Sequence, residues 1–92
     1  MLDIEYHNMF RKDYKKYLKN GFNSKLLDEV VLELRQQKTL APKHKDHILK
    51  GEWYPCRECH IKPNILLVYT VKNNALWLLR LGVAIVSCFR TV

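Results

Sequence analysis

The sequence predicts an α+β fold in which an N-terminal strand is followed by two antiparallel helices and then by an antiparallel meander sheet. Three observations predict this order. Residues 2–6 alternate between apolar and acidic side chains, residues 8–37 carry apolar side chains at helical spacing, and residues 53–82 hold three apolar segments. The 92 residues are expected to form a single domain, because a chain of this length buries one modest core.

The two helices are expected at residues 8–21 and 23–37. The first has an apolar stripe and is expected to end in a left-handed cap at Asn20–Gly21. Its stripe consists of Phe10, Tyr14, Tyr17 and Leu18. The second helix begins at Asn23 or Ser24 as its N-cap. Its apolar positions are Leu27, Val30, Val31 and Leu34.

Residues 38–52 are expected to form a basic surface loop, because Pro42, Gly51 and the polar run KHKDH interrupt any periodic pattern. The strands of the meander follow it, and a tight hairpin at residues 72–74 joins the last two. The expected strands are residues 53–61, 65–71 and 75–82.

The chain is basic, with 16 Lys and Arg residues against 9 Asp and Glu and a formal net charge of +7. A field of this sign attracts polyanions, so nucleic acid is the leading class of partner and an acidic protein is the alternative. The N-terminal segment has no secretory signal pattern, so we expect a cytoplasmic protein with reduced thiols. The apolar end, residues 75–89, is too short for a bilayer span and contains Arg80, so no membrane is expected as a partner.

The segment Cys56-Arg57-Glu58-Cys59-His60 has the C-x-x-C-H pattern of covalent haem attachment. That chemistry belongs to exported proteins, and the chain offers an axial methionine only at Met1 or Met9, so a cytochrome is disfavoured. A zinc site remains an alternative, because His44 and His47 could join the two cysteines. On a strand, however, Cys56 and Cys59 face opposite sides of the sheet and would not chelate one ion.

Four motifs resemble one known family: KDHILKG (residues 45–51), RECHIKPN (57–64), ILLVY (65–69) and LLRLG (78–82). They are similar to the YafQ branch of the RelE-like bacterial toxins, and the resemblance covers residues 1–82. It implies a RelE-like microbial RNase fold and a ribosome-dependent endonuclease that cleaves messenger RNA. It also implies a small antitoxin protein as partner, with no metal or other cofactor.

The candidate catalytic residues come from these motifs. By the resemblance, His47 and His60 match the family's catalytic histidines, while Glu58 and Arg80 match positions that line the same cleft. Metal-free RNA cleavage needs a base for the 2′-hydroxyl, an acid for the 5′-oxygen and cations for the phosphate, which two histidines and an arginine can supply. Arg80 could alternatively pair with Glu58 on a neighbouring strand and have no further role. The residues expected to bind RNA phosphates are Lys43, Lys45, Lys50 and Arg57.

Asn64 is the fifth candidate site residue, and it stands where the family usually has Asp, so an amide that can hydrogen-bond RNA replaces a carboxylate that titrates. The chain also departs from the family pattern along residues 83–92. Ala84 and Cys88 stand where near relatives of the pattern have a third histidine and a terminal Phe. The codons AGC CAT AGT GAG TTG TTT TAG encode Ser-His-Ser-Glu-Leu-Phe and a stop. Preceded by GT and read in the shifted frame, they encode residues 83–89 and then Arg or Ser at position 90. We interpret this tail as the frame-shifted end of an ordinary family member.

The altered tail leaves two classes of function open. The first is an RNA-cleaving toxin whose activity is weakened. The second is a catalytically impaired protein that still binds RNA and an antitoxin. A small zinc-binding domain is the remote alternative.

Overall fold

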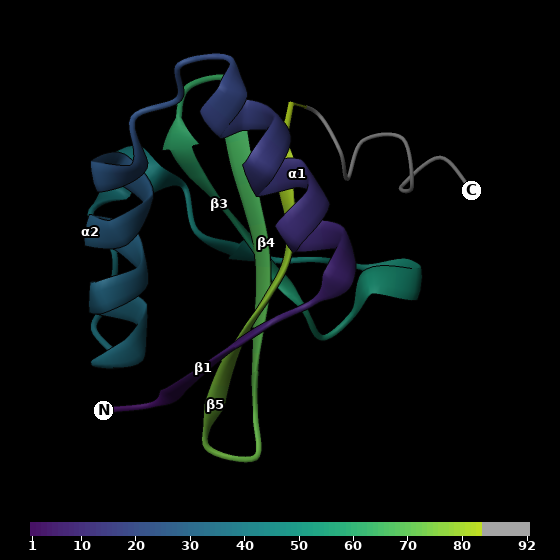
Figure 1. Cartoon of the computed structure of the whole chain (residues 1–92). Helices are drawn as coiled ribbons and strands as arrows, with labels where there is room; N and C mark the ends of the chain where they lie inside the picture. The colour runs from purple at the N-terminus through teal and green to yellow at the C-terminus, as the bar shows by residue number, and fades with distance from the viewer. Residues whose placement is uncertain (84–92) are drawn as a thin grey trace.

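A five-stranded sheet forms the centre of the protein, and its strand order is β1-β5-β4-β3-β2. The computed structural model describes residues 1–83. Strand β1 runs parallel to β5, and the remaining neighbours are antiparallel (Figure 1). The elements are β1 (Asp3–Tyr6), α1 (Asn8–Lys19), α2 (Ser24–Arg35), β2 (His47–Ile48), β3 (Arg57–Lys62), β4 (Ile65–Lys72) and β5 (Ala75–Gly82), with short 3₁₀ helices η1 (Pro42–His44) and η2 (Gly51–Trp53). The predicted α+β fold is therefore confirmed.

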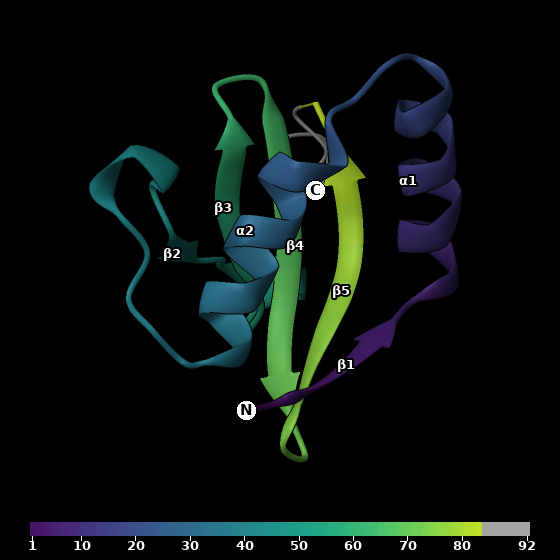
Figure 2. The same cartoon turned by 60° about the vertical axis from the view of Figure 1, so that its left-hand side comes forward.

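The two helices run in opposite directions along one side of the sheet (Figure 2). Asn23 begins α2, and its side chain accepts a hydrogen bond from the backbone N–H of Lys25 at 3.0 Å. Gly21, with φ of +85°, follows α1 in the left-handed conformation that was predicted there. The expected position of Leu18 on the apolar stripe is wrong, because its side chain is 44% exposed. Tyr17, the preceding residue of the predicted stripe, packs against the main core and contacts Phe22.

The main core lies between the helices and one face of the sheet. Phe10 from α1 and the four predicted apolar residues of α2 pack there against Cys59 and Leu67 of the central strands. A smaller cluster lies on the opposite face, where Leu49 and Val68 are fully buried. Trp53, Cys56 and Leu79 pack around these two side chains. No helix that is long and apolar enough to cross a membrane occurs in residues 1–83.

The segment before β3 differs from the prediction in two ways. Residues 38–52 are not all surface loop, because the smaller cluster buries Leu49 and β2 pairs with β3 through His47 and Ile48. The predicted strand at residues 53–61 begins only at Arg57, since η2 and Pro55, which has no N–H to donate, occupy the preceding positions. The predicted hairpin is confirmed, with Asn73 and Asn74 both at positive φ between β4 and β5.

Candidate active site

A row of side chains crosses the face of the sheet that the helices leave uncovered. The strand register aligns His47 with Glu58, Glu58 with Val68, and Val68 with Arg80. Cross-strand partners share a face, and the alternate residues Cys59 and Leu81 lie in the main core on the other face. The fold thus brings three of the predicted catalytic residues, His47, Glu58 and Arg80, onto one line across four strands.

His47 and Glu58 form the histidine–carboxylate pair of this row. The Nε2 atom of His47 lies 3.2 Å from Oε1 of Glu58, which is buried, and Nδ1 lies 2.8 Å from the carbonyl oxygen of Lys45. Both neighbours of the ring are oxygen atoms that can accept, so each ring nitrogen lies where it can donate a hydrogen bond.

His60 lies two residues after Glu58 on β3, so its side chain is on the same face about 7 Å further along the strand. Its Nδ1 atom is 3.3 Å from the carbonyl oxygen of Pro63. A carbonyl can only accept, so Nδ1 carries the proton and Nε2 of the neutral ring keeps its lone pair. His60 is therefore arranged to accept a proton.

The predicted pairing of Arg80 with Glu58 is wrong. Arg80 pairs instead with Asp13 of α1: Nε donates to Oδ2 at 2.8 Å, and Nη2 lies 3.4 Å from Oδ1. The reason is the strand order, since β4 separates β3 from β5 and the two strands lie about 10 Å apart. Asp13 also accepts the backbone N–H of Leu81 at 3.0 Å, so it holds both the guanidinium and the end of β5.

Asn64 is exposed in the turn between β3 and β4, directly after Pro63, whose carbonyl oxygen lies 3.3 Å from Nδ1 of His60. It borders a hollow of about 300 Å³ together with Tyr17, Asn20 and Val83. Ala84 and Cys88 lie outside the described residues, so the predicted loss of a histidine and a Phe from the site stays a prediction. The structure therefore groups His47, Glu58, His60 and Arg80 on one face, whereas the hollow that Asn64 lines contains none of these four residues.

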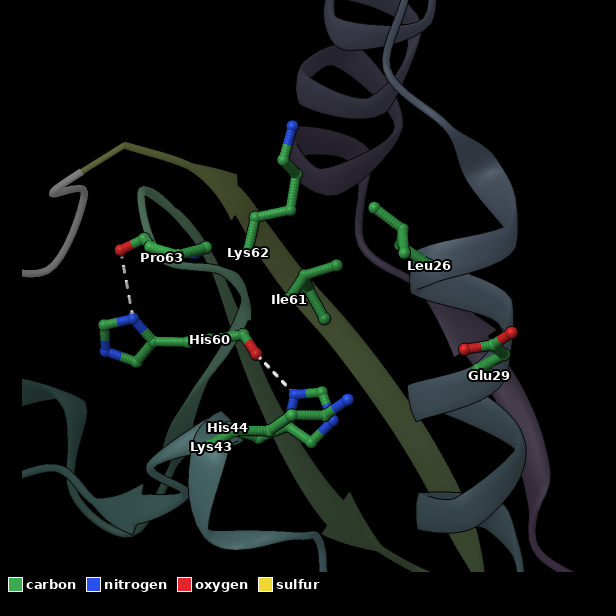
Figure 3. A pocket seen from close by; sticks show the side chains of 8 residues that line it. All are labelled: Leu26, Glu29, Lys43, His44, His60, Ile61, Lys62 and Pro63. Atoms are coloured by element: carbon green, nitrogen blue, oxygen red, sulfur yellow. Dashed lines mark hydrogen bonds between the residues drawn. The ribbon is translucent and has the colours of Figure 1, made fainter.

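The predicted RNA-binding residues are distributed around the row. Lys50 shares with His47 a hollow of about 300 Å³ along β2. Lys43 lines a hollow of about 220 Å³ between α2, η1 and β3 (Figure 3). Lys45, at φ 47°, forms the turn before β2. Arg57 points to the helix-covered side, where its Nε donates to Asp46 at 3.2 Å.

His44 lies in the hollow that Figure 3 shows, and its Nδ1 is 2.7 Å from the backbone oxygen of His60. The ring of His60 itself turns toward Pro63 and away from Leu26 and Glu29 of α2. His44 thus donates a hydrogen bond from Nδ1 to the backbone of β3, because a carbonyl oxygen can only accept. Within residues 1–83, no three His, Cys, Asp or Glu side chains are placed to hold one metal ion, and the two cysteines lie in clusters on opposite faces.

Three residues that matter for the site were not identified from the sequence: Asp13, Asp46 and Tyr69. Asp13 is the only acidic residue of α1, which is otherwise rich in lysine, and this was the available signal. Asp46 directly precedes His47 in the KDH motif. Its Oδ1 accepts a hydrogen bond from the hydroxyl of Tyr69 at 2.6 Å.

A small basic α+β protein with a histidine–carboxylate pair, a second histidine and an arginine on an open sheet face belongs to the class equipped for acid–base chemistry on a phosphodiester. Comparison with known proteins gives the family. The profile of a family described as "Bacterial toxin of type II toxin-antitoxin system, YafQ" matches residues 2–84. The chain belongs to this YafQ toxin family.

Individual relatives agree with this assignment. The mRNA interferase toxin YafQ of Escherichia coli strain K12 is 32% identical over 81 residues, which are 87% of this chain and 88% of the relative. A copper-bound mutant toxin from Helicobacter pylori is 52% identical with a TM-score of 0.88, covering 90% of this chain and 94% of that one. YafQ in the E. coli DinJ–YafQ complex is 29% identical with a TM-score of 0.82, covering 91% and 94%.

Proposed function

We propose that this protein is the toxin of a type II toxin–antitoxin system and cleaves messenger RNA as an endoribonuclease. The observation that carries the proposal is the row of His47, Glu58 and Arg80, with His60 beside it, on the open face of a YafQ-family fold. The related E. coli protein bears the name mRNA interferase toxin. We further propose that the RNA is cut on the ribosome in the cytoplasm. We also propose that an antitoxin protein binds this toxin, as DinJ binds YafQ in the E. coli complex.

The proposed mechanism gives the two histidines opposite proton transfers. Nε2 of His60 removes the proton of the 2′-hydroxyl, whose oxygen then attacks the adjacent phosphorus. The pair of His47 and Glu58 donates its proton to the departing 5′-oxygen, so the P–O5′ bond breaks as the new P–O2′ bond forms. Arg80 stabilises the negative charge on the non-bridging oxygens. The products are a 2′,3′-cyclic phosphate and a 5′-hydroxyl.

Copper is named for the H. pylori relative. In this chain, His47 and Glu58 provide two donor side chains within 3.2 Å of each other, but residues 1–83 place no third one with them. The described residues therefore do not form a metal site of the usual kind. The mechanism above uses only side chains of the protein.

The test is cleavage of a labelled messenger RNA, alone and bound to ribosomes, with mass analysis of the new ends. We expect a cyclic phosphate end, and a 2′-deoxy nucleotide at the cut position should stop cleavage. His47→Ala and His60→Ala should each slow cleavage by about 10²- to 10⁴-fold. A protein that binds RNA but leaves it intact would instead support the impaired binding protein, and a 3′-hydroxyl end would contradict the mechanism.

A further inference from the structure

Asp46 connects the segment that carries His47 to the sheet. It lies between η1 and β2, and its Oδ1 accepts hydrogen bonds from Tyr69 of β4 at 2.6 Å and from Arg57 of β3 at 3.2 Å. The carboxylate side chain is 22% exposed, and the Tyr69 side chain belongs to the main core. A loop residue is thus bonded to two strands of the sheet, one of them at its centre.

The segment needs such an attachment because β2 has only two residues and pairs with β3 alone. An isolated two-residue pairing contributes little stability of its own. Lys45, directly before Asp46, has φ of 47°, which is an uncommon conformation for a residue with a side chain. Side-chain bonds from Asp46 to the sheet therefore compensate for weak backbone pairing at the position where His47 must be held.

Asp46 cannot itself reach a substrate on the open face. Consecutive residues of an extended segment point to opposite sides, and its partners Arg57 and Tyr69 lie on the helix-covered side of the sheet. His47, the next residue, points to the open face and contacts Glu58. The peptide bond directly before Asp46 also supplies the Lys45 carbonyl that accepts a hydrogen bond from Nδ1 of His47 at 2.8 Å. Fixing Asp46 consequently fixes both the position and the ring orientation of His47.

The chemistry of the three partners suits a permanent attachment. Burial raises the pKa of Tyr69, and the hydrogen bond and negative charge of Asp46 raise it further, so the phenol remains a donor at every physiological pH. Arg57 supplies the positive charge that a partly buried carboxylate requires. Hydrogen bonds to charged groups are the stronger ones, and the 2.6 Å length falls in the range for O–H donating to a carboxylate.

We propose that Asp46 is a positioning residue for catalysis, which holds the imidazole of His47 against Glu58 through its bonds to Tyr69 and Arg57. The inference rests on the proposed catalytic role of His47. A misplacement of a reacting group by about 1 Å can lower a rate about 100-fold, so a loosened segment should be visible in the rate of the chemical step. RNA affinity should change little, because Asp46 faces away from the RNA.

The experiment compares Asp46→Asn and Tyr69→Phe with Glu52→Gln, a control that removes the same charge from an exposed carboxylate of η2. Nitrogen-15 NMR of the histidine side chains reports the tautomer and titration of His47 in the intact protein. We expect both Asp46→Asn and Tyr69→Phe to change the His47 signals, and Glu52→Gln to leave them unchanged. Tyr69→Phe keeps the ring in the core and removes only one bond, so it serves if Asp46→Asn does not fold.

Cleavage of messenger RNA provides the second measurement. We expect Asp46→Asn to lower kcat by about tenfold or more with KM within about twofold, and Tyr69→Phe to have a smaller effect in the same direction. Asp46→Ala removes the acceptor oxygen altogether, so adding Tyr69→Phe to Asp46→Ala should slow cleavage no further. Unchanged His47 signals in Asp46→Asn would overturn the inference. If His47→Ala cleaves normally, the proposed catalytic role fails instead, and the NMR result still decides whether Asp46 orients His47.

Discussion

Replacing Asp13 by Ala removes the carboxylate that connects α1 to the end of β5. It deletes the bonds to Nε and Nη2 of Arg80 and to the backbone N–H of Leu81. Breaking a buried ion pair by removing one partner costs about 3–5 kcal/mol, and each hydrogen bond to a charged group contributes about 1.5–3 kcal/mol. Both side chains of this pair are 18% exposed, so water screens them in part. We expect the free energy of unfolding to fall by about 3 kcal/mol.

The effect is large enough to measure by thermal unfolding. For a chain of this size, about 3 kcal/mol corresponds to a decrease in Tm of roughly 12–24 °C. Asp13→Asn should be milder, because the amide oxygen can still accept one of the bonds although the charge is lost. Cleavage should also slow in Asp13→Asn at temperatures where the variant is folded, since Arg80 then loses its fixed orientation.

A double-mutant cycle separates the ion pair from the rest of the helix. Asp13→Ala combined with Arg80→Ala should show an interaction energy of about 1–3 kcal/mol. Glu29→Ala serves as the control, because it removes an exposed carboxylate from α2 with the same change in charge. The reasoning is refuted if Asp13→Ala unfolds at the same temperature as Glu29→Ala, or if the two single effects simply add.

Three further predictions concern pH, salt and the tail. Burial raises the pKa of the thiol of Cys59 above its ordinary 9.0 and that of Tyr69 above 10.0. The stability from the neutral thiol is therefore complete below pH about 9, and that from the neutral phenol below pH about 10. Each is lost above that pH at about 1.4 kcal/mol per pH unit. Cys59→Val should flatten the pH dependence of chemical-denaturation midpoints measured between pH 8 and 10. RNA affinity should fall steeply with salt, and a flat dependence in filter binding would show that the charge serves a protein partner instead. Replacing residues 83–92 by Ser-His-Ser-Glu-Leu-Phe should raise the cleavage rate, and His60→Ala in that background should abolish the gain; an equal rate before and after replacement would contradict the assignment of the tail.

Local patterns were sufficient to predict the elements whose stability comes from neighbouring residues. The apolar positions of α2, its N-cap at Asn23 and the Asn73–Asn74 hairpin follow from periodicity and turn chemistry, and the structure confirms them. The loop before β3 could not be predicted in this way. Leu49 is buried only because Val68, on a strand later in the chain, offers it a surface on the open face. Two adjacent apolar residues, Ile48 and Leu49, in a polar run carry no periodic signal.

The hydrogen-bond partners of the site residues could not be predicted from local patterns either, because they are distant in the sequence. Asp13 and Arg80 are separated by 67 positions, and Asp46 and Tyr69 by 23. The sequence contains carboxylates enough to pair with Arg80 in several ways, and only the strand order excludes Glu58. The resemblance to a family identified the residues of the proposed active site: His47, Glu58, His60 and Arg80. It did not identify the residues behind them, because no motif marked the distant partners of Arg80 and Asp46.

Asp13 and Asp46 lie behind the two ends of the row of site residues, where the sheet alone provides the least support. Glu58 lies on an inner strand, paired with β2 on one side and β4 on the other, so the sheet itself holds it. His47 and Arg80 lie where backbone pairing is weakest: one on a two-residue edge strand, the other beyond Leu78, where the pairing of β5 with β1 ends. Each of these two positions is attached by a carboxylate from outside its own strand, Asp46 in one case and Asp13 in the other. Under the proposed mechanism, these two attachments hold His47 and Arg80 in place at opposite ends of the row.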